Sequence, residues 1–144
     1  MHIRTIPSAD THLLRRLVLR NNDADAVVIW SGDDHPEGFH LGAFIGDQCI
    51  GIASFRPEAN SLFPGQNHYR LRGMATHPDH QGSGIGSELL RSAITILRER
   101  QADQLWCNAR KVALPFYERN GFRTEGEPFL MEVIGAHYLM YQPL

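Results

Sequence analysis

Hydrophobic positions recur along the chain at strand spacing and helix spacing in turn. Apolar and polar residues alternate from His2 to Ile6, which predicts a first strand. A helix is predicted from Ser8, a residue type that caps helices, to Arg20, because apolar residues recur there at helical spacing: Leu13, Leu14, Leu17 and Val18. Residues 21 to 38 hold one short apolar stretch between Asp- and Gly-rich flanks, which predicts a second short helix or an irregular loop.

The middle of the chain predicts three strands and one helix. Phe39 to Ile45 and Gln48 to Phe55 are strand patterns joined by Gly46-Asp47, a pair typical of hairpin turns. After a polar segment, His68 to Thr76 predicts another strand. The helix that follows, from about Ser87 to Arg100, has one apolar face, formed by Leu89, Leu90, Ala93, Ile94 and Leu97.

The last third of the chain predicts one more helix and three strands. Gln104 to Ala109 is a strand pattern, and the preceding helix is long enough to be a crossover, which makes the two strands around it parallel. Lys111 to Asn120 predicts a helix, and Phe122 to Phe129 and Gly135 to Tyr141 predict the final strands. This order predicts an α/β fold with a mixed sheet and helices on both faces. No repeat or linker divides the chain, so we expect residues 1 to 144 to form a single domain.

Composition and charge exclude several classes of protein. The 144 residues are 42% hydrophobic and 21% charged, which is typical of a soluble globular domain. A net charge of -2 provides no broad basic field, so no nucleic-acid partner is expected. The chain has no long apolar run and no signal-peptide pattern, so we expect no membrane partner and a cytoplasmic location. Cys49 and Cys107 lie in apolar runs, where a cysteine is usually a small buried hydrophobe.

The segment Gln81 to Gly86, with the sequence QGSGIG, lies between a predicted strand and a predicted helix. Glycine permits positive φ and close approach of a ligand to backbone N–H groups. The N–H groups of the first helical turn have no internal partner, and the helix dipole favours negative charge there. The segment therefore predicts a site for a phosphate-bearing ligand.

Two common phosphate loops do not fit this spacing. A nucleotide P-loop needs Lys followed by Ser or Thr after its last glycine, but Gly86 is followed by Ser87-Glu88. A dinucleotide-binding loop has the spacing G-x-G-x-x-G and an acid at the end of the next strand. Here the spacing is G-x-G-x-G, and Asp103 precedes the next strand.

Three segments resemble the GNAT family of N-acetyltransferases. QGSGIG resembles the family's Q/R-x-x-G-x-G/A loop, which holds the pyrophosphate of acetyl-coenzyme A. Leu71 to Pro78 resembles the family's central strand, and Asn108 with Phe116 to Phe122 resembles its fifth strand and following helix. The resemblance implies a mostly antiparallel sheet of about seven strands, with a parallel pair splayed around the cofactor. It also implies transfer of acetyl from acetyl-coenzyme A to a primary amine of a small molecule or peptide, and suggests that two copies can pair.

The resemblance also implies roles for individual residues. Tyr117 matches the tyrosine that many members direct at the thioester sulfur, where a phenol can donate a proton to the departing thiolate. Asn108 would hydrogen-bond the pantetheine arm or an ordered water, and Arg119 would pair with the coenzyme phosphates. The predicted cofactor-binding residues are Met74, Ala75, Thr76, Gln81, Gly82, Ser83, Gly84, Ile85, Gly86, Ser87, Asn108, Phe116 and Arg119.

The general base and the acceptor stay open at this stage. The candidate bases are His68, His77, Asp79, His80, Glu132 and His137. Glu132 and His137, near the last hairpin, are also predicted to line the acceptor side. No metal site is predicted, because Pro78 interrupts the helical spacing of His77 and His80 and no further ligand set accompanies them. Two alternatives to direct transfer remain: ping-pong transfer through Cys107, and a catalytically silent coenzyme A-binding or sensory module.

Overall fold

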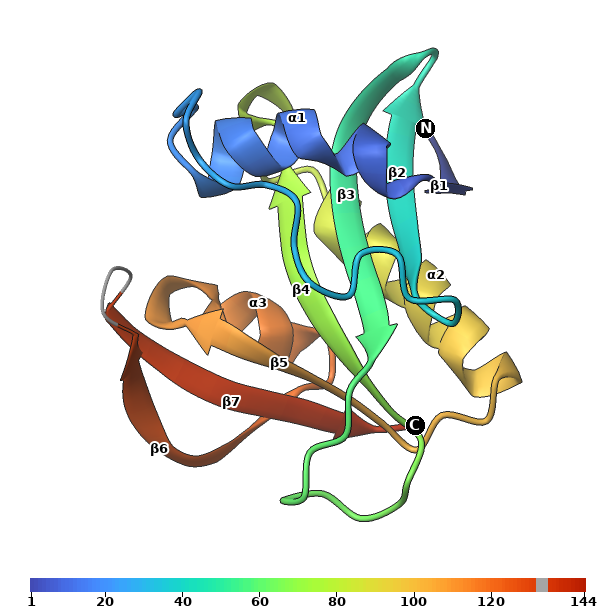
Figure 1. Cartoon of the computed structure of the whole chain (residues 1–144), viewed down its shortest axis with the longest axis vertical. Coiled ribbons are helices and arrows are strands. Elements are labelled where there is room, and N and C mark those ends of the chain that lie inside the picture. The colour runs from blue at the N-terminus through green and yellow to red at the C-terminus, as the bar shows by residue number, and fades with distance from the viewer. Residues whose placement is uncertain (132–134) are drawn as a thin grey trace.

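A computed structural model describes residues 1–131 and 135–144 of the chain. Seven strands form one sheet in the order β1-β2-β3-β4-β5-β7-β6 (Figure 1). All neighbouring strands are antiparallel except β4 and β5, which confirms the predicted mixed sheet and its parallel pair. The strands are β1 His2–Ile6, β2 Phe39–Ile45, β3 Gln48–Pro57, β4 His68–Thr76, β5 Gln104–Arg110, β6 Arg123–Met131 and β7 Gly135–Pro143.

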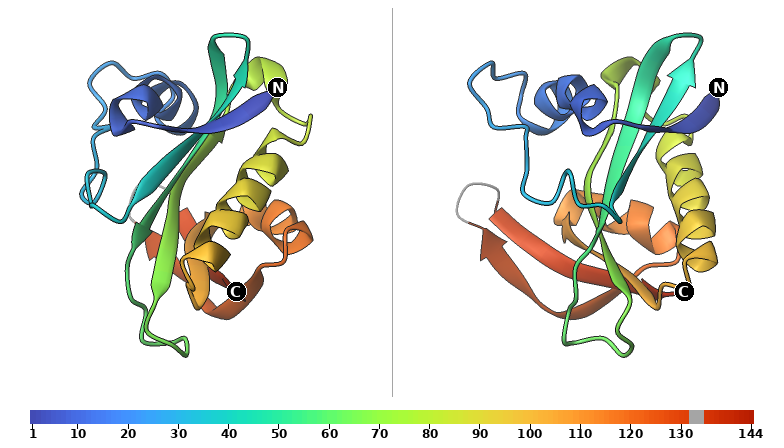
Figure 2. Two further views of the ribbon diagram at one scale, coloured as in Figure 1. Left: turned by 90° about the vertical axis from the view of Figure 1, so that its right-hand side faces the viewer. Right: turned by 45° about the vertical axis from the view of Figure 1, so that its right-hand side comes forward.

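Helices cover both faces of the sheet, as predicted. The first helical segment combines a 3-10 turn, Ser8–Thr11, the short α1, His12–Leu14, and a π-helical turn, Arg15–Leu19. It lies on one face, and α2, Ile85–Glu99, lies on the other together with α3, Leu114–Arg119 (Figure 2). A 3-10 turn, Lys111–Ala113, leads from β5 into α3.

The first helical segment departs from the predicted helix in two ways. Leu13 was expected in the apolar face but is 71% exposed, whereas Arg15 is completely buried. The buried face is formed instead by Thr11, Leu14 and Arg15, which lie on one side of the helix at spacings of three and four residues and leave Leu13 outside it. Ser8 does not cap the segment; its hydroxyl donates to Asp34 instead, and Pro7 occupies the cap position. Residues 21 to 38 form turns, so the irregular loop is the correct alternative.

Two hydrophobic cores lie on opposite faces of the sheet. The larger core packs one face of α2 against the strands, with Leu89, Leu90 and Leu97 almost fully buried. The smaller core packs Leu14 of α1 against Ile52 of β3 and neighbouring side chains. Three of the four predicted apolar residues of the first helix, Leu14, Leu17 and Val18, therefore pack in this core, whereas Leu13 does not.

The parallel pair of strands separates partway along its length. β4 and β5 pair only from His68 opposite Gln104 to Arg70 opposite Trp106. Beyond this point the rest of β4 continues with β3, and the rest of β5 continues with β7. The sheet therefore opens between the far ends of β4 and β5, at the position where the splayed pair was expected.

Candidate functional site

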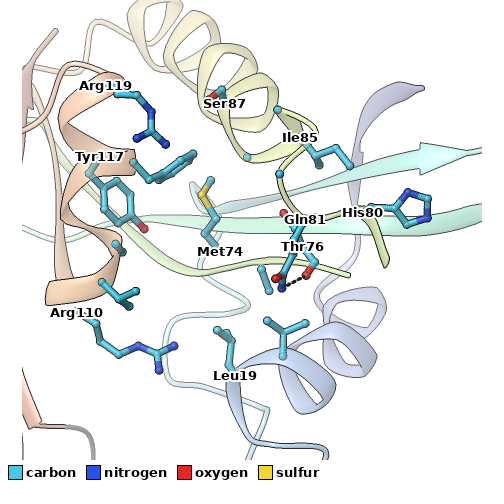
Figure 3. A pocket seen from close by; sticks show the side chains of 18 residues that line it. Leu19, Met74, Thr76, His80, Gln81, Ile85, Ser87, Arg110, Tyr117 and Arg119 are labelled. Carbon is cyan, nitrogen blue, oxygen red and sulfur yellow. Dashed lines mark hydrogen bonds between the residues drawn. The ribbon is translucent and has the colours of Figure 1, made fainter. Parts of the chain in front are cut away.

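A pocket of about 790 Å³ lies at this opening (Figure 3). Its size falls in the range of small-molecule and cofactor sites, roughly 300–1,000 Å³. Four parts of the chain contribute to it: the end of β4, the loop before α2 with the first turn of that helix, the segment from Arg110 to α3, and the end of the first helical segment. The lining residues are Val18, Leu19, Met74, Ala75, Thr76, His80, Gln81, Gly82, Gly84, Ile85, Gly86, Ser87, Arg110, Val112, Ala113, Phe116, Tyr117 and Arg119.

The backbone conformation at two positions of the loop favours glycine. Gly82 has φ of +81° and Gly84 has φ of +85°, in the left-handed region that other residues rarely adopt. A Cβ added to either residue would meet no atom within 4 Å, so packing does not demand a glycine there. Gly84 is also the N-cap of α2 and supplies no capping side chain. The first N–H groups of α2 are therefore available to an anion, which fits a phosphate or pyrophosphate group.

Gly86 has a different role from the other two glycines. It lies inside the first turn of α2, because the helix begins at Ile85, two residues earlier than predicted. A Cβ at Gly86 would lie 2.9 Å from Cζ of Phe116 in α3. Gly86 therefore permits the close packing of α2 against α3, and it also lines the pocket; its predicted contact with the cofactor stays a prediction.

Internal hydrogen bonds hold the loop in shape. The side-chain amide of Gln81 donates to the carbonyl of Thr76 at 3.1 Å, which ties the loop to the end of β4 (Figure 3). The Ser83 hydroxyl donates to the carbonyl of His80. The backbone N–H of Asp79 donates to Nδ1 of His77 at 3.1 Å. The loop is thus pre-formed, and a ligand does not have to order it.

The charged side chains of the pocket are cationic. Arg110, at the end of β5, and Arg119, in the last turn of α3, both line it (Figure 3). None of the described lining residues is acidic. Two guanidinium groups and a helix N-terminus therefore face one cavity, which favours a ligand with several negative charges.

Tyr117 contributes a phenol to the pocket. Its ring makes edge contacts with Phe116 and Phe122, at centroid distances of 5.1 and 5.2 Å, and its hydroxyl points toward Met74 (Figure 3). Burial raises the pKa of Tyr117, the nearby Cys107 raises it further, and Arg110 lowers it in part. The phenol is therefore uncharged at neutral pH and can donate a proton or a hydrogen bond.

Cys107 is buried in the core beneath the pocket. It is 2% exposed, belongs to the larger core and does not line the pocket. Burial raises the pKa of its thiol to about 12, and the charge of Arg70 only partly opposes this. A nucleophilic cysteine needs access and a thiolate, and the surroundings of Cys107 disfavour both.

Comparison with known proteins shows the family of this chain. The model of the acetyltransferase (GNAT) family matches residues 8–122. An uncharacterized N-acetyltransferase of Bacillus subtilis (strain 168), YitI, is 37% identical over 145 residues, with 100% of this chain and 97% of the relative covered. The chain belongs to the GNAT acetyltransferase family.

Solved structures agree with this GNAT assignment at the level of the fold. A chain from Lactobacillus plantarum has a TM-score of 0.80 at 20% identity, over 100% of this chain and 99% of that chain. An aminoglycoside 6'-N-acetyltransferase complexed with coenzyme A also has a TM-score of 0.80, at 14% identity, over 99% and 97% of the two chains. The mostly antiparallel seven-stranded sheet with one parallel pair is therefore the GNAT fold, as the resemblance implied.

Most residues predicted from the GNAT resemblance gather at the pocket. Tyr117 and all the predicted cofactor residues except Ser83 and Asn108 line it. Ser83 uses its hydroxyl within the loop. Asn108 lies on β5 between Cys107 and Ala109, which both point into the core, so strand alternation directs it to the other face of the sheet. Its contact with the pantetheine arm stays a prediction.

The candidate bases are spread over the structure. Of the candidate bases that the structure describes, only His80 lines the pocket. His68 is buried, and both of its ring nitrogens are used, one by the N–H of Asn60 and the other by the carbonyl of Pro64. His137 is 5% exposed and pairs with Arg110 in the β5–β7 ladder. Glu132 lies outside the described residues. The base of this GNAT chain is therefore not fixed by the pocket geometry.

Several lining residues were not predicted. Arg110 follows a predicted strand, where a charged residue is unremarkable in a sequence. Val18 was expected in the apolar face of the first helix, and Leu19 was not singled out; both lie in the π-helical turn and line the pocket. In the described part of the chain, no group of three or more His, Cys, Asp or Glu residues could hold a metal ion. None of the described helices has the length and hydropathy needed to cross a bilayer.

Proposed function

We propose that this GNAT chain transfers an acetyl group from acetyl-coenzyme A to a primary amine of a small molecule or peptide, by direct attack in a ternary complex. The observation that carries the proposal is the single pocket that joins an uncapped helix N-terminus to a protonated Tyr117. One end suits a pyrophosphate and the other suits a departing thiolate, and these groups lie at the two ends of the pantetheine arm of an acyl-coenzyme A.

The donor is proposed to bind along the pocket. The N–H groups at the start of α2 would receive the pyrophosphate, with Arg110 and Arg119 as further cationic partners. Backbone groups of Met74 and Thr76, on the side of β4 that has lost its strand neighbour, would pair with the pantetheine amides. The coenzyme A complex of the structurally similar aminoglycoside acetyltransferase supports this choice of donor.

The chemistry requires two proton transfers. The neutral amine forms the new C–N bond with the acetyl carbon, the C–S bond breaks, and the sulfur leaves with the electron pair of that bond. The amine gives a proton to a base, and Tyr117 donates one to the sulfur and recovers it from solvent. A thiol has an ordinary pKa of about 8.5 and a phenol of about 10, so this donation also needs the pocket to disfavour the thiolate. Because burial raises the pKa of Tyr117 as well, the phenol is proposed to hydrogen-bond the sulfur as negative charge develops there and to transfer its proton only as the C–S bond breaks.

Covalent transfer through Cys107 is the weaker alternative. Its burial and raised pKa, about 12, oppose formation of an acetylated cysteine. A coenzyme A-binding module without catalysis is the second alternative, and it would need the same pocket but no role for the Tyr117 hydroxyl.

The test is an acetylation assay with the purified protein, acetyl-coenzyme A and a panel of amines. We expect release of coenzyme A thiol together with an acetylated amine detected by mass spectrometry. Tight binding of acetyl-coenzyme A with no release above the spontaneous rate for any amine would favour the binding module over the enzyme.

A further inference from the structure

The opening between β4 and β5 has a second side, opposite α2 and α3. Arg70 and Trp106 form the last parallel pair, and the guanidinium of Arg70 lies 5.1 Å from the Trp106 ring centroid on this side. Two residues further along each strand, Arg72 and Asn108 continue the same face. These two side chains therefore flank the opening on the face opposite α2 and α3.

Positive charge is concentrated on this side. Four arginines lie near Arg72, and the five together are called here the arginine cluster: Arg15, Arg20, Arg56, Arg70 and Arg72. Burial lowers the pKa of Arg72, and the charges of the other four arginines lower it further. Gathering like charges in a partly buried place destabilises the protein, and the chain as a whole carries a net charge of -2. The arginine cluster is thus a local concentration of positive charge in a chain whose net charge is negative.

Carboxylates compensate only part of the arginine cluster. Asp33 forms a two-pronged ion pair with Arg15, at 2.7 and 2.9 Å. Glu58 pairs with Arg56 at 2.8 Å and with Arg70 at 3.2 Å. Among the described side chains, those of residues 1–128 and 136–144, none forms an ion pair or hydrogen bond with the guanidinium of Arg72. With respect to these side chains, the five N–H donors of this half-buried guanidinium are available to solvent or to a ligand.

Trp30 supplies an aromatic wall beside Arg72. The Arg72 guanidinium carbon lies 4.6 Å from the centroid of the Trp30 ring, and that of Arg15 lies 3.9 Å from it. The backbone N–H of Trp30 donates to Asp33 at 2.9 Å, which ties the loop to the buried ion pair. Gly73, at φ of +75°, makes room for the ring, since a Cβ there would lie 2.4 Å from it. Arg72 is thus held against a fixed surface, as a pre-organised binding group requires.

From this placement we infer that the acceptor is an amine that also carries an oxyanion, a carboxylate or a phosphate, and that Arg72 binds this group at the mouth of the opening. The inference rests on the proposed function and adds the class of its acceptor. The pocket is lined mainly from the α2 and α3 side and reaches Val18 and Leu19 on the other face, so an acceptor held by Arg72 would approach the thioester from that other face. Arg20, whose guanidinium lies 5.5 Å from the Trp30 ring centroid, adds positive charge to the same place.

The first experiment compares amines that differ only in charge. Glycine, β-alanine, γ-aminobutyrate and 5-aminovalerate place a carboxylate at increasing distances from the amine. Their carboxamides are the neutral controls, and phosphoethanolamine and 3-aminopropyl phosphate test phosphate. We expect kcat/KM for at least one oxyanion amine to exceed that of its neutral counterpart by about tenfold or more. The better of the two series identifies the oxyanion.

Variants of Arg72 give the second readout. Arg72→Gln should raise KM for the preferred oxyanion amine about 10- to 100-fold and leave KM for acetyl-coenzyme A unchanged, and Arg72→Lys should restore part of the loss. Arg98→Gln, on the exposed end of α2, makes the same change in net charge and should alter neither value. An equal KM for the acceptor in Arg72→Gln and wild type would overturn the assignment to Arg72.

The outcomes separate the inference from the proposed function. Acetylation of neutral or cationic amines with no preference for an oxyanion overturns the inference and keeps the acetyltransferase. No thiol release with any amine overturns both. Preference for an oxyanion amine that disappears in Arg72→Gln supports both.

Discussion

Gly86 and Phe116 approach so closely that a Cβ on Gly86 would lie 2.9 Å from Cζ of Phe116. The contact joins the first turn of α2, which offers its N–H groups to the pocket, to α3, which carries Tyr117. The anion-binding end of the site and its proposed acid are therefore fixed relative to each other by packing. In the proposed complex, this contact would set the distance between the sites for the pyrophosphate and the sulfur of the donor.

Gly86→Ala should disturb this contact. The new methyl group overlaps the Phe116 ring, which costs about 1–3 kcal/mol, against a gain of roughly 1 kcal/mol in helix propensity. We expect a lower melting temperature and a higher KM for acetyl-coenzyme A. The double variant Gly86→Ala with Phe116→Leu should recover part of the stability, because the smaller side chain leaves room. Additive effects of the two substitutions would contradict the direct contact.

Gly82→Ala should weaken donor binding through the backbone. Its φ of +81° costs an alanine about 1–2 kcal/mol, and the loop can relieve this only by changing shape. The matched control is Gly46→Ala in the β2–β3 hairpin, where φ is +58° and a Cβ also meets no atom within 4 Å. Both variants should lose stability, but only Gly82→Ala should raise the dissociation constant of acetyl-coenzyme A in calorimetry. The same dissociation constant in both would show that the loop conformation does not serve the ligand.

Asp33 should make the stability of the protein depend on pH in the acid range. Burial alone raises the pKa of Asp33, but hydrogen bonds from Arg15 and from the N–H of Trp30, with the charge of Arg15, outweigh it and hold the pKa below its ordinary value. The stabilisation is present above the ordinary pKa, near 4, and is lost as pH falls through the lowered value. Asp33→Asn should cost about 3 kcal/mol at pH 7 and flatten the decline of stability below pH 4.

The control for this substitution is Asp47→Asn, at an exposed position of the β2–β3 hairpin. It should leave both the stability at pH 7 and its decline in acid nearly unchanged. Urea unfolding followed from pH 7 to pH 3 measures both variants. If the stability of Asp33→Asn followed the wild-type curve, the ion pair between Asp33 and Arg15 would not stabilise the protein.

Cys107→Ala should leave acetyl transfer intact. The thiol is buried, and its pKa of about 12 keeps it protonated at the pH of any ordinary assay. We expect kcat within about twofold of wild type and a modest loss of stability from the small cavity. An acetylated Cys107 trapped in the wild-type protein, together with an inactive Cys107→Ala that remains folded, would establish the covalent route instead.

The sequence predicts the order of strands and the position of the loop well, because alternation and glycine spacing are local properties. The parallel pair β4 and β5 followed from the length of the helix between them, and the hairpin at Gly46-Asp47 from turn chemistry. The close approach of Gly86 to Phe116 could not be predicted from the sequence, because the two residues meet only when α2 and α3 pack on one face of the sheet.

The misplaced residues have a common physical cause, because the contacts that bury them are distant in sequence. The buried face of the first helical segment is formed by Thr11, Leu14 and Arg15, so Leu13 is exposed although it is apolar. A buried arginine at this position is stable only because Asp33, Ser54 and the carbonyl of Val28 surround it, and these partners are distant in sequence. The arginine cluster could not be predicted either, since its members come from the first helical segment and the residue after it, from β3 and from β4.

Tyr117→Phe tests the proposed acid. The phenylalanine ring keeps the contacts with Phe116 and Phe122, so stability and acetyl-coenzyme A binding should change little. Because the pKa of Tyr117 is raised, the wild-type phenol stays protonated, and kcat should show no decline from its ionisation as pH approaches 10. Tyr69→Phe is the control: that hydroxyl donates to the carbonyl of Glu37 at 3.1 Å, away from the residues that line the pocket, so stability should fall while kcat persists.

The most direct measurement is kcat of Tyr117→Phe at saturating acetyl-coenzyme A and amine, beside the dissociation constant of acetyl-coenzyme A for the same protein. We predict a kcat about 10²- to 10⁴-fold below wild type, with a dissociation constant within about twofold. A kcat equal to that of wild type would contradict the assignment of Tyr117 as the acid that protonates the departing thiolate.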